Sequence, residues 1–351
     1  MKVALVTSIP HGGPIEHAVL LARELAALGV DVRTVVRDRP LAERFPRAAV
    51  IPLRHQLDAI NATRVHRYVS DVDIIHSHDR RAGLWMRTVP TRPARVHTLH
   101  GLPDPYLGDP GLLARLAYGQ FERRLRADLL LAPSHAAARA LRELVGYTQP
   151  IEVVPNGVDV PDEPLPRGEL VGTLSAHEPV KGLDVFLDAV PRVLEHRPET
   201  RFAIYGTGSL EAQLRERARG LPVTFPGHVP AEQALRELAV MALPSHMETS
   251  GIALLQAMAH GIPAVATRVG GIEETAPEGA ASLIPPRDPE ALAAAILDLL
   301  DDRDFAQARI RAGRAAAFER TARRTAERTL SLYESVMRAP RSRETVNRAS
   351  V

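Results

Sequence analysis

The sequence of 351 residues contains no cysteine. This excludes disulfides, thiol nucleophiles and cysteine-ligated zinc or iron–sulfur sites. No apolar run approaches the ~20 residues that a membrane-spanning helix needs. The first ten residues, MKVALVTSIP, are too short and too soon followed by proline and glycine for a signal peptide, and they are typical of a first β-strand. We therefore expect a cytoplasmic protein.

Aromatic residues are also scarce, at 4%, and the net charge is only +2. No long basic run and no helix-turn-helix or zinc-finger spacing is present, so no nucleic-acid partner is expected. Lysine is rarer still: of 44 lysines and arginines only Lys2 and Lys181 are lysine. Lys181 stands in the stretch HEPVKGLD, residues 177–184, and a lysine kept in so arginine-rich a chain suggests a specific role.

What the sequence does contain is an alternation of short apolar runs with longer amphipathic segments. The runs KVALVT, DVRTVV, DIIHSH, RVHTLH and LLLAPS are predicted strands, apolar enough for a parallel sheet covered on both faces. The proline-rich stretch 155–169 interrupts the pattern, which then resumes. We predict an α/β protein with two Rossmann-like doubly wound domains facing across a cleft, 1–160 and 161–320. A helix at 321–338 packs back toward the first domain, and residues 339–351 form a disordered tail.

Polar residues follow several predicted strands of the first domain. Gly12 and Gly13 let the backbone turn tightly and approach a ligand, although they do not form the G-x-G-x-x-G dinucleotide motif. His76 and His78 end another strand, and His100 a third. Two histidines two residues apart can be metal ligands, but nothing nearby in the sequence completes a coordination set, so we predict no metal site.

Residues 244–274 are the most informative stretch. Glu248 lies in a loop after a strand, and Ser250, Gly251 and Ile252 open the next helix with free backbone N–H groups that favour an anion. Gln256 follows eight residues after Glu248, and the pair Gly270-Gly271 is predicted to open a second helix in the same way. A lysine beside such helix ends can neutralise a phosphate, which gives Lys181 a reason to be there.

These stretches together resemble the retaining glycosyltransferases of family 4, which have the GT-B fold. The resemblance covers nearly the whole chain in order: HGG…H, TLHG, APS, VVPNGVD, the KG loop, FPGHVP, and an E-x7-E region followed by GIP and VGGI. It implies a nucleotide-sugar donor held mainly by the C-terminal domain and an acceptor on the N-terminal domain. It also implies transfer with retention of the anomeric configuration, no essential metal and no cofactor.

The resemblance also assigns roles to individual residues. It implies that His100 contacts the transferred sugar, that Lys181 holds the donor diphosphate and that Glu248 lies near the sugar hydroxyls. It implies that Gly12 and Gly13 line the phosphate and acceptor side. The remaining donor-site residues that it implies are Thr173, Gly227, Val229, Ser250, Gly251, Ile252 and Gln256.

Two positions depart from the family pattern. Gln256 replaces the second Glu of E-x7-E, which usually grips the ribose hydroxyls, so the charge assistance of a carboxylate is lost there. Thr173 stands where many members place an arginine on the diphosphate, and His177 or Arg268 is a candidate replacement. We expect weaker donor binding or an altered nucleotide preference.

Two alternatives to a transferase stay open: a degenerate sugar-nucleotide-binding protein without turnover, and an epimerase or phosphorylase of the same fold. The sequence does not reveal the acceptor, whose contacts are expected in loops 37–57 and 101–120. The segment 106–126 mixes apolar residues with arginines. This is typical either of an ordinary domain helix or of one that rests on the inner face of an anionic membrane.

Overall fold

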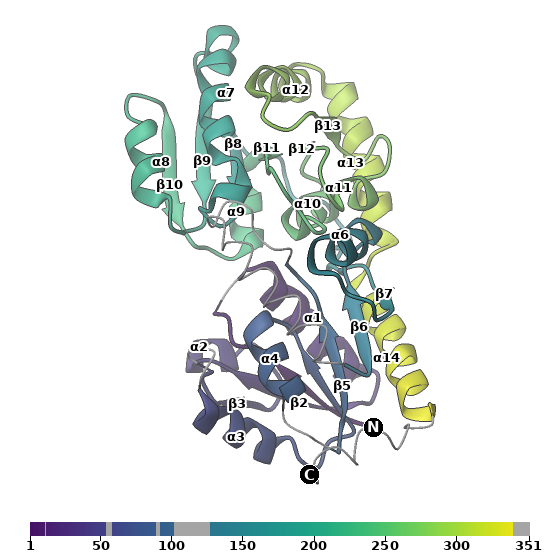
Figure 1. The fold of residues 1–351 in the computed structure, drawn as a ribbon. Helices are drawn as coiled ribbons and strands as arrows, with labels where there is room; N and C mark the ends of the chain where they lie inside the picture. The colour runs from purple at the N-terminus through teal and green to yellow at the C-terminus, as the bar shows by residue number, and fades with distance from the viewer. Residues whose placement is uncertain (11, 54–57, 89–91, 102–126, 340–351) are drawn as a thin grey trace.

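The structure is a computed structural model that describes residues 1–10, 12–53, 58–88, 92–101 and 127–339. Figure 1 shows two α/β lobes, one built from the first part of the chain and one from the second, with the last helix running back along the first lobe. The segment 106–126, most of the loop 101–120, residues 54–57 and the tail from 340 onward lie outside the described residues. The predictions made for them stay predictions.

The first lobe is built on a parallel sheet. Within the described residues it has seven strands in the order β3-β2-β1-β4-β5-β6-β7. The strands are β1 (Lys2–Val6), β2 (Asp31–Val36), β3 (Ala48–Val50), β4 (Ile74–Ser77), β5 (Ala94–Thr98), β6 (Leu129–Ala132) and β7 (Ile151–Val153). The helices that connect them are α1 (Gly13–Ala27), α2 (Arg39–Ala42), α3 (Ala59–Tyr68), α4 (Arg80–Thr88) and α6 (His135–Val145).

The apolar strand sequences follow from burial on both faces of this sheet. Val3 and Leu5 of β1 join one buried cluster with α1, whereas Ala4 and Val6 join another with α3 and α4. Successive side chains of a strand point to opposite faces, so a strand covered on both faces must be apolar at every position. This is why the sequence shows continuous apolar runs.

The second lobe repeats the design with a six-stranded parallel sheet in the order β10-β9-β8-β11-β12-β13. Its strands are β8 (Leu170–Leu174), β9 (Arg201–Tyr205), β10 (Val223–Gly227), β11 (Leu238–Leu243), β12 (Ala264–Thr267) and β13 (Ser282–Ile284). A short 3₁₀ helix, η1 (Pro179–Lys181), follows β8. The α-helices are α7 (Leu183–His196), α8 (Glu211–Arg217), α9 (Ala231–Glu237), α10 (Ile252–Ala259), α11 (Ile272–Thr275), α12 (Pro289–Asp301) and α13 (Arg303–Phe318).

The chain passes between the lobes twice, and the two passages run side by side. A β-bridge joins Val158 in the first passage to Thr321 in the second. Helix α14 (Ala322–Arg338) then packs on α1 of the first lobe (Figure 1). Its Tyr333 is fully buried there, and the Tyr333 hydroxyl lies 2.5 Å from Nδ1 of His76 on β4.

The predicted fold class is confirmed: two parallel-sheet α/β domains lie on either side of a shared cavity. Helix α13 was not predicted. It begins at the N-cap Asp302, whose side chain accepts a hydrogen bond from the Phe305 N–H, and it follows directly on α12. In both sheets the strand order reverses next to the first strand of the domain, and ligands of such sheets bind at this point, beyond the carboxyl ends of the strands.

Candidate active site

A cavity of about 660 Å³ lies between the domains, a volume typical of small-molecule sites. It is lined by loops that follow β1, β5 and β7 of the first sheet and β8, β9, β10 and β11 of the second. Ten of the predicted site residues line it: Gly12, Gly13, His100, Lys181, Val229, Glu248, Ser250, Gly251, Ile252 and Gln256. The carboxyl ends of both sheets therefore meet at one site.

Lys181 is fixed by the glycine that follows it. Gly182 has φ of +62°, and a Cβ added there would stand 2.0 Å from the Pro244 carbonyl oxygen. The residue after the lysine must therefore be glycine, both for its left-handed backbone and for this close approach. The contact holds the end of η1 against the loop after β11. In this position the Lys181 ammonium lies beside Glu248.

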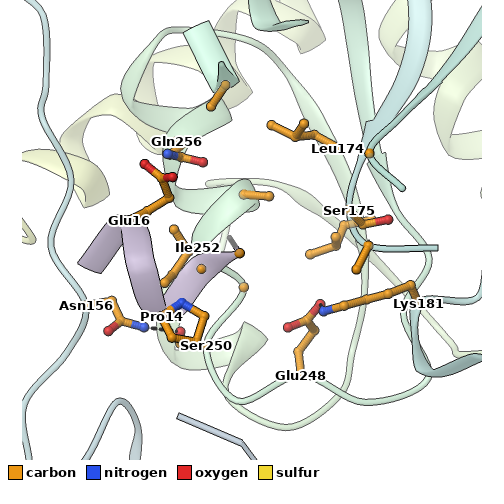
Figure 2. Close-up of a pocket in the computed structure, with 18 of the residues that line it drawn as sticks. Pro14, Glu16, Asn156, Leu174, Ser175, Lys181, Glu248, Ser250, Ile252 and Gln256 are labelled. Atoms are coloured by element: carbon orange, nitrogen blue, oxygen red, sulfur yellow. Dashed lines mark hydrogen bonds and ion pairs between the residues drawn. The ribbon is translucent and has the colours of Figure 1, made fainter. Parts of the chain in front are cut away.

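Glu248 and Lys181 form an ion pair inside the cavity (Figure 2). Nζ of Lys181 lies 2.6 Å from Oε1 of Glu248, which also accepts a hydrogen bond of 2.9 Å from the Ser245 hydroxyl. The Glu248 side chain is only 9% exposed and that of Lys181 is 24% exposed. An ammonium has three N–H donors, so Lys181 can bind a phosphate oxygen while it keeps Glu248.

The sequence pattern predicts that Gly270 and Gly271 form a second anion site. In the structure they instead support the loop that carries Glu248. A Cβ on Gly270, whose φ is +53°, would stand 1.8 Å from the Glu248 carbonyl oxygen. That same oxygen accepts the Gly271 N–H at 3.1 Å, so this amide is already used. The two glycines lie behind the Glu248 backbone, and neither lines the cavity.

The start of α10 does present N–H groups to the cavity. Gly251 is its N-cap, with φ of +68°, and Ser250, Gly251 and Ile252 all line the cavity. Within the described residues no backbone acceptor pairs with these three N–H groups. First-turn N–H groups have no partner inside their own helix and favour an anion.

Hydrogen bonds across the cleft fix the loop 248–250 against the first domain. The Thr249 hydroxyl donates to the His100 carbonyl at 3.0 Å, and the Ser134 hydroxyl donates to the Thr249 carbonyl at 2.6 Å. The Asn156 side-chain amide donates to the Ser250 hydroxyl at 2.6 Å. These bonds fix the position of His100, on the wall of the first domain, relative to the loop 248–250 on the wall of the second.

Three histidines of the first domain form a cluster, the histidine cluster, of which His100 lines the cavity whereas His17 and His78 are buried. His17 of α1, His78 after β4 and His100 after β5 pack together, and Nδ1 of His78 lies 3.3 Å from Nε2 of His100. Burial lowers the pKa of His17 to about 4 and holds the pKa values of His78 and His100 well below the ordinary value. These imidazoles are therefore neutral at pH 7.

The same three histidines correct one sequence inference. One ring nitrogen from each lies within 4.8 Å of the other two, so His78 does have neighbours that could complete a set of metal ligands. Sequence spacing missed them because tertiary structure brings His17 and His100 to His78. His76 is not part of the group, since its two ring nitrogens contact Tyr333 and the Thr98 hydroxyl.

Two predicted donor-site residues do not line the cavity. Thr173 is fully buried within β8, and Gly227 ends β10 one residue before the lining residue His228. Neither candidate for the missing arginine replaces it. His177 is fully buried with its pKa lowered by burial, so it is neutral, and Arg268 pairs with Glu273 at 2.6 Å outside the cavity.

Sequence reasoning missed several polar lining residues, among them Glu16, Arg44 and Asn156. Asn156 stands in the PNGVD stretch, immediately beyond the last strand of the first sheet, and strand-end position was the signal for it. Glu16 lies one helical turn after Gly13, which could also have been read from the sequence. Arg44 follows the short helix α2, and no local pattern marks it.

The fold and this cavity define the class of GT-B glycosyltransferases, and comparisons with known proteins agree. The family model described as Glycosyl transferases group 1 matches residues 169–302, and the one described as Glycosyltransferase Family 4 matches residues 11–161. A crystal structure of Anabaena HepE in complex with UDP and glucose superposes with a TM-score of 0.82 at 18% identity, covering 95% of this chain and 100% of that one.

Several relatives share about 30% identity with the chain, including the following two. The phosphatidyl-myo-inositol mannosyltransferase of Mycobacterium leprae aligns over 93% of both chains. The glycogen synthase of Mycobacterium tuberculosis aligns over 69% of this chain, which spans 63% of the length of that relative. The chain belongs to glycosyltransferase family 4.

Proposed function

We propose that the protein is a retaining, metal-independent glycosyltransferase that moves a sugar from a nucleoside-diphosphate sugar to an acceptor hydroxyl. The observation that carries the proposal is the convergence of Lys181 and the free N–H groups of α10 on one wall of a cavity, with His100 on the opposite wall. The positive charge of Lys181 and the N–H groups of α10 suit a diphosphate, and the imidazole of His100 suits a sugar hydroxyl. The name of the mannosyltransferase relative makes a mannosyl donor and an inositol-bearing acceptor the first pair to screen.

In this proposal the C1–O bond to the diphosphate breaks and its electron pair goes to the leaving phosphate oxygen. Lys181 and the amides of Ser250, Gly251 and Ile252 stabilise the charge that develops there. The acceptor oxygen attacks C1 on the same face, and its proton passes to the departing phosphate. His100 accepts a hydrogen bond from, or donates one to, a hydroxyl of the transferred sugar.

The first experiment is a thermal-shift screen with UDP, GDP, ADP and their sugar conjugates on the wild type and on Lys181→Ala. A ligand that binds the native state raises the melting temperature. We expect one nucleotide to stabilise the wild type and the variant to lose most of that shift. If no nucleotide shifts the wild type, the donor site as proposed is wrong.

Retention and metal independence need a second experiment. The anomeric configuration of the product is read by NMR, and turnover is measured with and without EDTA. We expect a retained configuration and no effect of the chelator. Loss of turnover on chelation, restored by one added cation, would contradict metal independence and direct attention to His17, His78 and His100.

A non-catalytic sugar-nucleotide binder is the second candidate. It is favoured by the buried Thr173 and by Gln256, which remove two groups that the family uses on the donor. Isothermal titration that shows binding of a sugar nucleotide, without hydrolysis or transfer to any acceptor tested, would support this reading.

A further inference from the structure

Glu16 is a carboxylate inside the cavity to which the proposed function gives no role. It lies in the first turn of α1, on the wall opposite Gln256, and both residues line the cavity. Figure 2 shows the Glu16 carboxylate pointing toward the side-chain amide of Gln256. The two side chains come from different domains.

Contact between two helix ends explains this placement. A Cβ added to Gly13 would stand 3.0 Å from Cδ1 of Ile252, so the first residue of α1 lies against the first residue of α10. Glu16 follows Gly13 by three residues and Gln256 follows Ile252 by four. Residues at these spacings share one face of a helix, so each side chain lies one turn beyond the point of contact.

The chemistry of the pair suits two adjacent hydroxyl groups. A glutamine side chain accepts hydrogen bonds only through its carbonyl oxygen, whereas a carboxylate accepts through both oxygens and with the strength of a charged acceptor. Nη2 of Arg44 lies 2.8 and 3.0 Å from the two Glu16 oxygens. One N–H donor group does not exhaust the lone pairs of a carboxylate, and Arg44 keeps the group oriented.

We infer that Glu16 and Gln256 together bind the ribose hydroxyls of the donor, with Glu16 supplying from the first domain the carboxylate that Gln256 lacks. The inference rests on the proposed function. It makes Glu16 a determinant of donor affinity and makes both domains, rather than the second alone, hold the nucleoside.

The test is a double-mutant cycle between protein and ligand, measured by isothermal titration. The probes are whichever of UDP, GDP and ADP binds the wild type, and its 2′-deoxy and 3′-deoxy analogues. We expect Glu16→Gln to weaken binding of the parent nucleotide by about 5- to 10-fold, the difference between a charged and a neutral acceptor. Removal of the contacted hydroxyl should then cost the variant clearly less than it costs the wild type.

Moving the charge provides the second arm. Glu16→Gln combined with Gln256→Glu should restore most of the affinity, whereas Gln256→Glu alone places two carboxylates face to face and should not improve binding. Glu24→Gln is the matched control, because it removes a carboxylate from the same helix outside the cavity.

Equal deoxy penalties in the wild type and in Glu16→Gln, with no rescue in the double variant, would overturn the role of Glu16 and leave the proposed function standing. Failure of all three nucleotides to bind the wild type would instead overturn the donor site itself. The melting temperature of each variant without ligand shows that it is folded.

Discussion

The two walls of the cavity are built from different chemistry. The wall of the second domain carries an ion pair, Lys181 with Glu248, beside the open N–H groups of α10. On the first domain His100 lines the cavity and packs on His17 and His78, and burial keeps this histidine cluster neutral. A departing diphosphate needs fixed positive charge, whereas a sugar that becomes oxocarbenium-like is disfavoured by a cation close to C1. In the proposed reaction, a protonated histidine cluster would oppose the bond breaking that Lys181 is proposed to assist.

The walls also differ in what holds them in place. On the second domain the contacts are backbone to backbone, with Gly182 against Pro244 and Gly270 against Glu248. On the first domain they are between side chains: the rings of the histidine cluster pack on one another, and His78 also packs on His76, which the hydroxyls of Thr98 and Tyr333 hold. The ion-paired wall of the second domain should therefore be sensitive to an added Cβ, and the histidine cluster of the first domain to protonation.

The largest effect that separates the walls should come from Lys181→Ala. Loss of a preorganised group that stabilises the leaving phosphate typically costs 10²- to 10³-fold in kcat, or about 3–4 kcal/mol on the barrier. Steady-state kinetics with a nucleotide-sugar donor measures this, and Lys181→Gln, which keeps a partner for Glu248, guards against simple unfolding. Arg268→Ala removes a cation outside the cavity and should leave kcat unchanged. Equal losses in the lysine and arginine variants would show that general surface charge, and not this wall, carries the effect.

A smaller effect, on stability, should follow from Gly182→Ala. The substitution forces a left-handed residue and places a Cβ 2.0 Å from the Pro244 oxygen, so we expect a loss of about 2–4 kcal/mol and weaker nucleotide binding. Gly220→Ala is the matched control, since it has a similar φ of +79° with nothing within 4 Å of the added Cβ. It should cost only about 1 kcal/mol. Urea unfolding gives both values, and equal losses would mean that the close approach to Pro244 contributes nothing.

Sequence reasoning succeeded where one local segment carries its own signal. The apolar runs predicted the strands. Lys181 was singled out by the scarcity of lysine, and Glu248 and the start of α10 by a strand end and a glycine, and all of them line one cavity. It failed where the fold decides between equivalent candidates. Gly270-Gly271 has the same pattern as an anion-binding helix start, yet its carbonyl contacts place it behind the loop. The grouping of His17 with His78 and His100, and the approach of Glu16 to Gln256, depend on elements that meet only in the folded chain.

The last prediction concerns the pH dependence of the histidine cluster, whose effect is spread over more than two pH units. The pKa of His17 is about 4 in the folded protein, below its ordinary value of 6.5. Between these two pH values the unfolded chain binds a proton at this residue and the folded chain does not. The stability tied to this residue is complete above pH 6.5 and is lost as the pH falls from 6.5 toward 4. In that window it contributes a slope of about 1.4 kcal/mol per pH unit to the free energy of unfolding.

Urea unfolding of the wild type and of His17→Gln between pH 7 and 4.5 should show the smaller slope in the variant. His196→Gln, which removes an exposed histidine at the end of α7, is the control. Identical slopes in all three proteins would mean that the histidine cluster accepts protons freely, and the contrast between the ion pair of the second domain and a neutral cluster in the first would fail.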